Sequence, residues 1–382
     1  MNNEYYSAFL DAAVSAISSA QHPADIKSIT DFSLPFSQGC NIPTRFASAS
    51  QRSIDNLDEE LSRFENQFIG KNNSIFWAST YDDVFASLKK LFKSYKVKSV
   101  RLPNIQSSTI FREIGIKYFL ADEKVALRDD GDIQFFVADL MFSDTGSLLL
   151  TNQSNNTLAK LTNAHTNVFF TSIDRVCSST DWAEVYQQLA CPDNGGNRQD
   201  MLLFKTSENC NNYLFIIDNQ RTKLLAQPAL RQALSCTHCG RCKAVCPVYQ
   251  TIGDEPYNNV FTGPIANVLL PYFETFESYS HLSYACTLCG RCEEVCPLAL
   301  PIRDMMLETR ALLLAENHCD KDDRRLLAVL RKYALSRSKL NGAPFFKKHL
   351  ISKYISSEFK HRRRFPSFSK ESFNSSFKSH ER

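Results

Sequence analysis

A cysteine motif that occurs twice constrains the fold of this chain more than any other feature. The stretch Cys236-Thr-His-Cys-Gly-Arg-Cys-Lys-Ala-Val-Cys-Pro247 returns as Cys286-Thr-Leu-Cys-Gly-Arg-Cys-Glu-Glu-Val-Cys-Pro297, so that each cysteine recurs fifty positions later. Intervals of two, two and three residues, closed by proline, let three thiolates bind one four-iron, four-sulfur (4Fe-4S) cluster while the fourth binds a neighbouring cluster. The repeat therefore predicts two adjacent 4Fe-4S clusters.

The same rule predicts that the two motifs exchange ligands. One cluster is expected to bind Cys236, Cys239, Cys242 and Cys296, and the other Cys286, Cys289, Cys292 and Cys246. Gly240 and Gly290 lack a Cβ, which lets each loop turn backbone N–H groups toward sulfur and stabilise negative charge there. Two neighbouring clusters suit stepwise electron transfer.

Zinc and disulfides are the alternatives for so many cysteines. Zinc bound by four thiolates uses two separated pairs, so a third cysteine after two further residues and a fourth before proline fit a 4Fe-4S cluster better. A disulfide framework fits the clustering less well still. Five of the thirteen cysteines are scattered, and we expect small buried side chains there, because none has a recognisable base beside it: Cys40, Cys177, Cys191, Cys210 and Cys319.

Upstream of the motifs, short apolar strands alternate with helices. The 382 residues, 43% of them apolar, leave room for about two domains. Apolar spacing predicts helices at 57–68 and 82–95, and strands at 74–80, 97–102, 116–120, 133–138, 148–151, 168–173, 202–205 and 213–217. Strands that alternate with helices predict an α/β domain with a largely parallel sheet covered on both faces. Residues 192–197 are expected to form a polar loop.

From about residue 228 the pattern changes to short helical pieces, followed by longer predicted helices at 302–317 and 322–335. The 39 residues between Cys246 and Cys286 exceed what a compact two-cluster ferredoxin requires, which favours an all-α, helical ferredoxin domain. The predicted organisation is an N-terminal helical segment at 1–56, an α/β domain at 57–225, the two-cluster domain at 226–336 and a basic flexible tail at 337–382.

Charge is distributed unevenly along the chain. Residues 321–382 hold 17 Lys and Arg against 5 Asp and Glu, a net +12, although the whole chain carries only +3. Such a tail can contact an acidic partner or a membrane surface. Nucleic acid is not the expected partner, because no helix-turn-helix or similar fold is indicated. No stretch of about twenty apolar residues predicts a membrane span, and residues 1–20 resemble an amphipathic helix, so we expect a cytoplasmic protein.

Several stretches that occur in one order support a family resemblance. Downstream these are Ile217-Asp-Asn-Gln-Arg221, Cys236 to Tyr249, Phe261-Thr-Gly-Pro-Ile265 and Ala285 to Pro297, and upstream Ala138-Asp-Leu-Met-Phe-Ser-Asp-Thr-Gly-Ser-Leu148. Together they resemble the iron-sulfur component of a three-part bacterial L-lactate oxidation system. The resemblance implies a LUD domain, related to the isomerase and CoA-transferase α/β group, fused to the ferredoxin domain. It also implies two partners, a cysteine-rich oxidoreductase subunit and a second LUD-domain protein.

The leading hypothesis is an electron-transfer subunit of a lactate-oxidising complex whose catalytic centre lies in a partner. The alternatives are a redox-sensing iron-sulfur regulator, a subunit of another dehydrogenase or of a complex like heterodisulfide reductase, and a self-contained enzyme. No catalytic residue is assigned. Two short polar groups, Asp144-Thr-Gly146 and Asp218 with Arg221, are candidate ligand sites, although a turn and a domain tie are the ordinary explanations. His165 and His238 are weaker candidates, the latter beside the cluster.

Overall fold

The computed structural model describes residues 3–19, 41–101, 119–120, 123–127, 133–151, 166–190, 201–205, 210–257 and 263–315, together with the single residues 325, 328, 331, 332, 335, 336, 338, 349 and 377. The chain divides into two compact units, residues 1–318 and 319–382. All helices and strands given below belong to the first unit.

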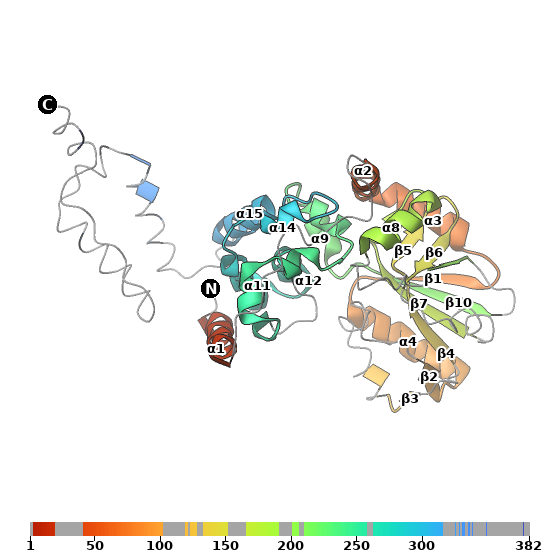
Figure 1. Cartoon of the computed structure of the whole chain (residues 1–382). Coiled ribbons are helices and arrows are strands. Elements are labelled where there is room, and N and C mark those ends of the chain that lie inside the picture. The colour runs from red at the N-terminus through yellow and green to blue at the C-terminus, as the bar shows by residue number, and fades with distance from the viewer. Residues whose placement is uncertain are drawn as a thin grey trace. The chain divides into compact units, whose positions relative to one another are not determined.

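A parallel six-stranded sheet forms the centre of the α/β region (Figure 1). Its order is β1 (Asn73–Ala78), β10 (Asn211–Ile217), β7 (Thr166–Ser172), β4 (Ile133–Val137), β2 (Ser99–Arg101) and β3 (Ala126–Leu127). Three buried asparagines fix the register of β1, β10 and β7, because Asn167 donates to Asn212 at 3.0 Å and Asn212 donates to Asn73 at 2.9 Å. Since the strands are parallel, their carboxyl ends lie at one edge.

Alternating side chains of these strands enter two different cores. Phe135, Phe170 and Phe215 pack with helix α4 (Tyr81–Tyr95), which begins at a capping box between Thr80 and Asp83. Other side chains of the same strands pack with helix α3 (Leu57–Phe68) and with a second sheet, and they include Phe136, Phe169, Leu214 and Ile216. The predicted coverage of both sheet faces is therefore confirmed, with a helix on one face and a helix plus strands on the other.

The second sheet has four strands in the order β8 (Val176–Cys177), β5 (Leu140–Phe142), β6 (Ser147–Leu150) and β9 (Leu202–Phe204). Its hairpin, β5 and β6, turns at Gly146, whose φ is +68°. An added Cβ there would lie 2.7 Å from the backbone of Gln67, so only glycine fits. On its outer face lie the helices α2 (Ile42–Asp55) and α8 (Ala183–Ala190), and the short 3-10 helix η3 (Thr180–Trp182) precedes α8.

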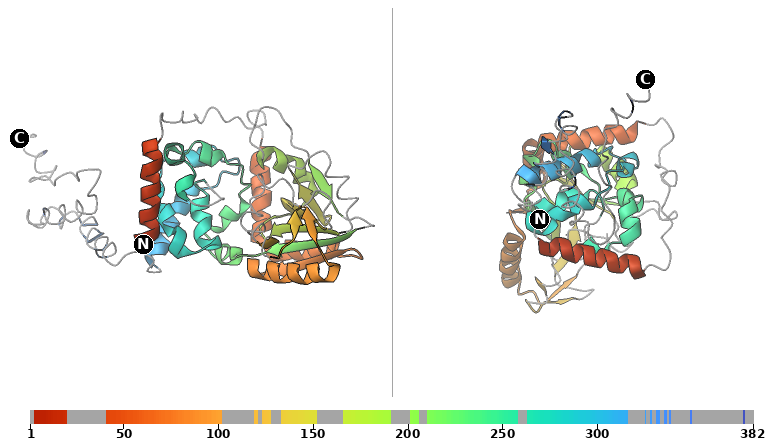
Figure 2. Two further views of the ribbon diagram at one scale, coloured as in Figure 1. Left: turned by 90° about the horizontal axis from the view of Figure 1, so that it is seen from below. Right: turned by 90° about the vertical axis from the view of Figure 1, so that its left-hand side faces the viewer.

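The described part of residues 226–315 consists of helices and connecting segments, without a strand. After α9 (Arg221–Leu225) these are η4 (Arg231–Ser235), α10 (Arg241–Ala244), α11 (Pro247–Ile252), η5 (Glu255–Tyr257), α12 (Ala266–Phe273), α13 (Phe276–Tyr279), η6 (Ser280–Ala285), α14 (Arg291–Glu294) and α15 (Ile302–Ala315). The N-terminal helix α1 (Asn3–Ser19) packs on this region, where Phe9 contacts Tyr257 and His281 (Figure 2).

Most of the predicted elements appear within a few residues of their expected bounds. The helix predicted at 57–68 is α3, and the strands at 133–138, 168–173 and 213–217 are β4, β7 and β10. The strand predicted at 116–120 is wrong where it is described, because 119 and 120 are helical. The stretch 138–148, which the family resemblance relates to a strand-turn-strand, forms β5 and the start of β6. The short strands β3 and β8, and the joining of β8, β5, β6 and β9 into a second sheet, were not predicted. The 192–197 loop and most of the 322–335 helix and the basic tail lie outside the described residues.

Candidate metal centre

The two cysteine loops have the same backbone conformation. His238 and Leu288, two residues after the first cysteine of each motif, have φ of 56° and 57°. Each donates its backbone N–H to the first cysteine, at 3.4 Å to Cys236 Sγ and 3.3 Å to Cys286 Sγ. The left-handed residues His238 and Leu288, rather than the glycines singled out in the sequence, fold the chain so that these N–H groups face sulfur. Gly240 and Gly290 follow with φ of 74° and 78° and begin α10 and α14.

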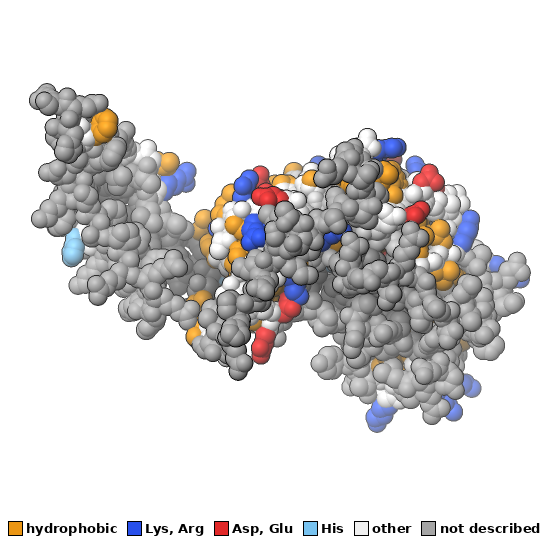
Figure 3. Space-filling view, viewed as in Figure 1, with side chains coloured by type: hydrophobic (Ala, Val, Ile, Leu, Met, Phe, Trp, Pro, Cys, Tyr) orange, Lys and Arg blue, Asp and Glu red, His pale blue; other side chains and the backbone are white. Residues whose placement is uncertain are grey.

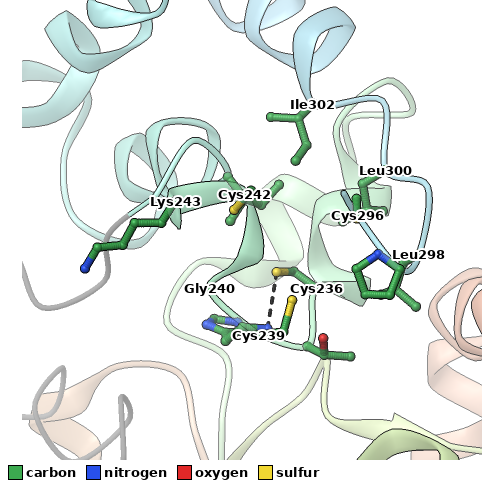
Figure 4. Close-up of a pocket in the computed structure, with 13 residues that line it drawn as sticks. Cys236, Cys239, Gly240, Cys242, Lys243, Cys296, Leu298, Leu300 and Ile302 are labelled. Atoms are coloured by element: carbon green, nitrogen blue, oxygen red, sulfur yellow. Dashed lines mark hydrogen bonds between the residues drawn. The ribbon is translucent and has the colours of Figure 1, made fainter. Parts of the chain in front are cut away.

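Four cysteines from both motifs line one cavity. Cys236, Cys239 and Cys242 come from the first motif and Cys296 from the second, as Figure 4 shows. The cavity has a volume of about 190 Å³. Leu298, Leu300 and Ile302 add apolar walls, and Lys243 points its ammonium group away from the sulfurs. The structure thus brings together the first of the two predicted ligand sets.

The other four cysteines form a second neighbourhood. Burial raises the pKa of Cys246, and negative charge on Cys286 and Cys289 raises it further. Burial likewise raises the pKa of Cys292 to about 12, with further contributions from the thiolates of Cys286, Cys246 and Cys289. Cys246 of the first motif therefore lies near cysteines of the second motif, and that these four bind one cluster stays a prediction. Cys289 is exposed, whereas Cys292 is buried.

The donor chemistry fits iron-sulfur clusters. Burial, together with the nearby Cys239 and Cys296, raises the pKa of Cys236 to about 12, so several thiolates in one buried pocket need bound positive metal. No three His, Cys, Asp or Glu side chains among the described residues converge on a single-ion site. A 4Fe-4S cluster has four separate irons, so its four ligands need not converge on one point. Backbone N–H groups of Leu298, Ala299 and Leu300 lower the pKa of Cys296, although its burial outweighs them.

Gly263 is a residue of this site that sequence reasoning did not single out. Its φ of +112° is open to glycine, and a Cβ there would lie 3.5 Å from Cys242 Sγ. The turn brings Ile265 to the cavity, where its backbone N–H faces the sulfur of Cys242. The stretch Phe261-Thr-Gly-Pro-Ile265 carried the signal, but a sequence cannot show that a glycine fifteen or more residues from any cysteine contacts a sulfur.

A buried charge network joins the sheet to the first cysteine loop. Asp174 and Arg175 follow the carboxyl end of β7, and their side chains are paired at 3.4 Å. Arg221, which begins α9 after β10, lies 2.8 Å from the same carboxylate. Arg175 donates to the carbonyl of Cys236 at 2.7 Å and contacts Nε2 of His238. His238 therefore belongs to the surroundings of the first cysteine set.

The aspartates of the two small polar groups singled out in the sequence accept hydrogen bonds from threonines of this chain. Asp144 accepts from the backbone N–H and the hydroxyl of Thr180, at 2.9 and 3.0 Å. Asp218 accepts from the backbone N–H and the hydroxyl of Thr222, both at 2.8 Å. Asp144 thus joins its turn to Thr180, and Asp218 binds the start of α9. The tie expected of this pair comes from Arg221, which lies 4.1 Å from the ring centre of Phe273. His165 lies outside the described residues.

Of the scattered cysteines, Cys177 and Cys210 are each 2% exposed, as expected for small buried side chains. Cys40, Cys191 and Cys319 lie outside the described residues. The visible face in Figure 3 carries acidic, basic and hydrophobic side chains together. No helix in the described ranges combines the length and the hydropathy needed to cross a membrane.

Comparisons with known proteins agree with this site. A family model described as a 4Fe-4S dicluster domain matches residues 232–300. Lactate utilization protein B of Macrococcus caseolyticus is 39% identical over 126 residues, which are 33% of this chain and 26% of the relative. The protein of the same name from Bacillus thuringiensis is 26% identical over 273 residues, 66% of this chain and 58% of the relative. The chain thus spans less than two thirds of these curated relatives.

A solved DUF162 family protein from Deinococcus radiodurans matches 42% of this chain and 98% of its own length, with 13% identity and a TM-score of 0.32. A TM-score this low does not establish a shared fold. The family model and the curated relatives agree with the cysteine cavity independently of this solved structure. The chain contains a 4Fe-4S dicluster domain and resembles the lactate utilization protein B family.

Proposed function

We propose that this chain holds two 4Fe-4S clusters and transfers electrons as a subunit of a lactate-oxidising complex. The observation that carries the proposal is one cavity lined by four cysteines, of which Cys236, Cys239 and Cys242 come from the first motif and Cys296 from the second. Exchanged ligation of this kind is typical of paired clusters. When bound, such a cluster takes up and releases single electrons.

The chain's own residues prepare the two sites in three ways. Backbone N–H groups in the left-handed loops face the first cysteine of each motif and stabilise negative charge on sulfur. Apolar side chains such as Leu300 and Ile302 line the first site and exclude water. Cys289 is exposed, which gives the second site an opening toward a redox partner.

Lactate as the substrate of the complex is supported by the name of the relatives, lactate utilization protein B. With them we propose a LUD-type α/β domain at 57–225 and a helical ferredoxin domain at 226–336, flanked by the segments 1–56 and 337–382. The α/β domain would dock a cysteine-rich oxidoreductase subunit and a second LUD-domain protein. The reaction centre would then lie in a partner.

The test is iron content and electron flow in protein purified without oxygen. We expect about eight irons and eight acid-labile sulfides per chain, since each cluster holds four of each. Cys239→Ser and Cys289→Ser should each remove one cluster signal and abolish lactate-dependent electron flow in the presence of the partners. Cys210→Ala, which changes a buried thiol outside both sets, is the control and should retain full iron. Full electron flow in either serine variant would refute the proposal.

A further inference from the structure

The first cysteine of each motif has a carbonyl that accepts a hydrogen bond from an arginine. Arg175 Nη1 donates to the carbonyl of Cys236 at 2.7 Å, and Arg310 Nη2 donates to that of Cys286 at 2.8 Å. Cys236 and Cys286 are equivalent positions of the internal repeat. Neither arginine belongs to a motif, so two unrelated parts of the chain supply the same contact.

The two arginines are fixed by different surroundings. Arg175 follows β7 of the large sheet, its side chain is 15% exposed, and Asp174 pairs with it at 3.4 Å. Asp174 is in turn held by Arg221 at 2.8 Å and by the hydroxyl of Ser172 at 2.5 Å. The sheet edge therefore holds this guanidinium rigidly.

Arg310 lies on α15, where it is held by carbonyls and an aromatic ring. Its Nε and Nη2 donate to the carbonyl of Ser283 at 3.0 and 2.6 Å, and its guanidinium lies 5.2 Å from the ring centre of Tyr284. It thereby joins α15 to η6, the short helix that leads into the second motif. The sheet does not take part in this contact.

We propose that Arg175 and Arg310 are equivalent positioning residues, each for one cluster. Arg175 would serve the cluster of Cys236, Cys239, Cys242 and Cys296, and Arg310 the cluster of Cys286, Cys289, Cys292 and Cys246. The proposal rests on the two-cluster function given above. A guanidinium on the first carbonyl fixes the loop whose N–H groups face sulfur, and its positive charge favours the more negative, reduced cluster.

The two cysteine loops have different residues at their left-handed position, and this difference corresponds to different contacts with the two arginines. The left-handed residue is His238 in the first loop, and its ring contacts Arg175, whereas the equivalent residue of the second loop is Leu288. Arg175 thus holds its loop through both a carbonyl and a side chain. Arg310 donates to the carbonyls of Ser283 and Cys286 and lies against the ring of Tyr284.

The experiment is a potentiometric titration of the full chain, followed by EPR, for Arg175→Gln and Arg310→Gln. Each variant should make one cluster harder to reduce, by about tenfold in the reduction equilibrium constant, which is about 59 mV for one electron. The cluster affected should differ between the variants. Arg175→Lys and Arg310→Lys, which keep the charge but lose the planar fork, should shift less. Arg63→Gln, at a side chain 53% exposed on α3, is the control.

Cluster assignment comes from Cys239→Ser and Cys289→Ser, each of which leaves a different signal. If a glutamine variant loses its cluster outright, the signal that remains must be that of the other cluster. The inference would be overturned if both variants shifted the reduction potential of the same cluster. A variant that shifted the potentials of both clusters, or of neither, would overturn it as well. Wild-type protein without two clusters would instead refute the proposed function.

Discussion

The sheet region and the cluster region of this chain differ in what holds them together. Strands β7 and β10 have seven residues each, and phenylalanines such as Phe169 and Phe215 are fully buried between them and the helices. In contrast, α10, α13 and α14 have four residues each and α11 has six. Helices of one turn are not stable alone. The cluster region also has an apolar core, to which α12 and α15 contribute, but the helices that follow its cysteine loops have only a single turn.

This difference indicates which region depends on metal. Buried thiols with raised pKa values, such as Cys236 and Cys292, are neutral without metal, and they lose their protons when positive metal binds them. The regions meet at the sheet edge, where Asn219 donates to the carbonyl of Phe273 at 3.0 Å and Arg221 lies 4.1 Å from its ring centre. The sheet should therefore fold first and present this edge to the cluster region.

The largest expected effect is that of iron removal. Anaerobic chelation should abolish slow hydrogen exchange in residues 231–300 and leave it in β7 and β10, because the short helices lose the ligands that organise them. Exchange followed by mass spectrometry measures both regions in one sample. Equal loss of protection in both regions would show that they fold as one unit. It would refute the claim that only the cluster region depends on metal.

A substitution in the core of the sheet region should destabilise that region and leave iron binding unchanged. Phe169→Ala is expected to lower the free energy of unfolding of the sheet region by about 3 to 5 kcal/mol, because the side chain is fully buried among Phe136 and Phe204. Iron content per folded chain should stay unchanged. Denaturant unfolding and iron analysis give the two readings. Ile69→Ala, at a residue 52% exposed, is the control and should cost about 0.5 kcal/mol or less.

Two glycines with nearly equal φ sharpen the comparison. At Gly146, φ +68°, an added Cβ would lie 2.7 Å from the Gln67 backbone, while at Gly253, φ +71°, it would meet nothing within 4 Å. Gly146→Ala should therefore cost about 2 to 4 kcal/mol, and Gly253→Ala about 1 kcal/mol from backbone strain alone. Thermal unfolding of both variants measures the difference between their losses of stability. Equal costs would show that the hairpin turn can move away from α3.

The sequence predicted the long periodic elements and the 4Fe-4S domain, because their signals are local, whereas the division of the eight cysteines between two clusters stays a prediction. The sequence did not predict the second sheet, since β8 has two residues and β5 three, too short for any alternation to be visible. Gly263 and the contacts of Arg175 and Arg310 were also missed. Each joins a cysteine to a residue far along the chain, and such pairing depends on the packed fold.

The smallest expected effect concerns the pH dependence of the sheet region. Burial raises the pKa of Asp139, after β4, from its usual 3.8 to about 6, although Thr151 donates its backbone N–H and hydroxyl to the carboxylate at 2.7 and 2.9 Å. Below pH 4 the carboxyl is protonated in both folded and unfolded chains. Between pH 4 and 6 only the unfolded chain ionises, so stability falls with rising pH and then levels off.

Because Asp139 retains some solvent exposure, we expect the fall to be about 1 to 2 kcal/mol, less than a shift of two pKa units implies for a fully buried group. Asp139→Asn keeps an acceptor for Thr151 but cannot ionise, so it should remove this part of the pH dependence and be more stable than wild type at pH 7. Urea unfolding of the sheet region at pH 4, 5, 6 and 7 tests it. Parallel profiles for the two proteins would mean that water reaches the carboxyl and that burial does not raise its pKa.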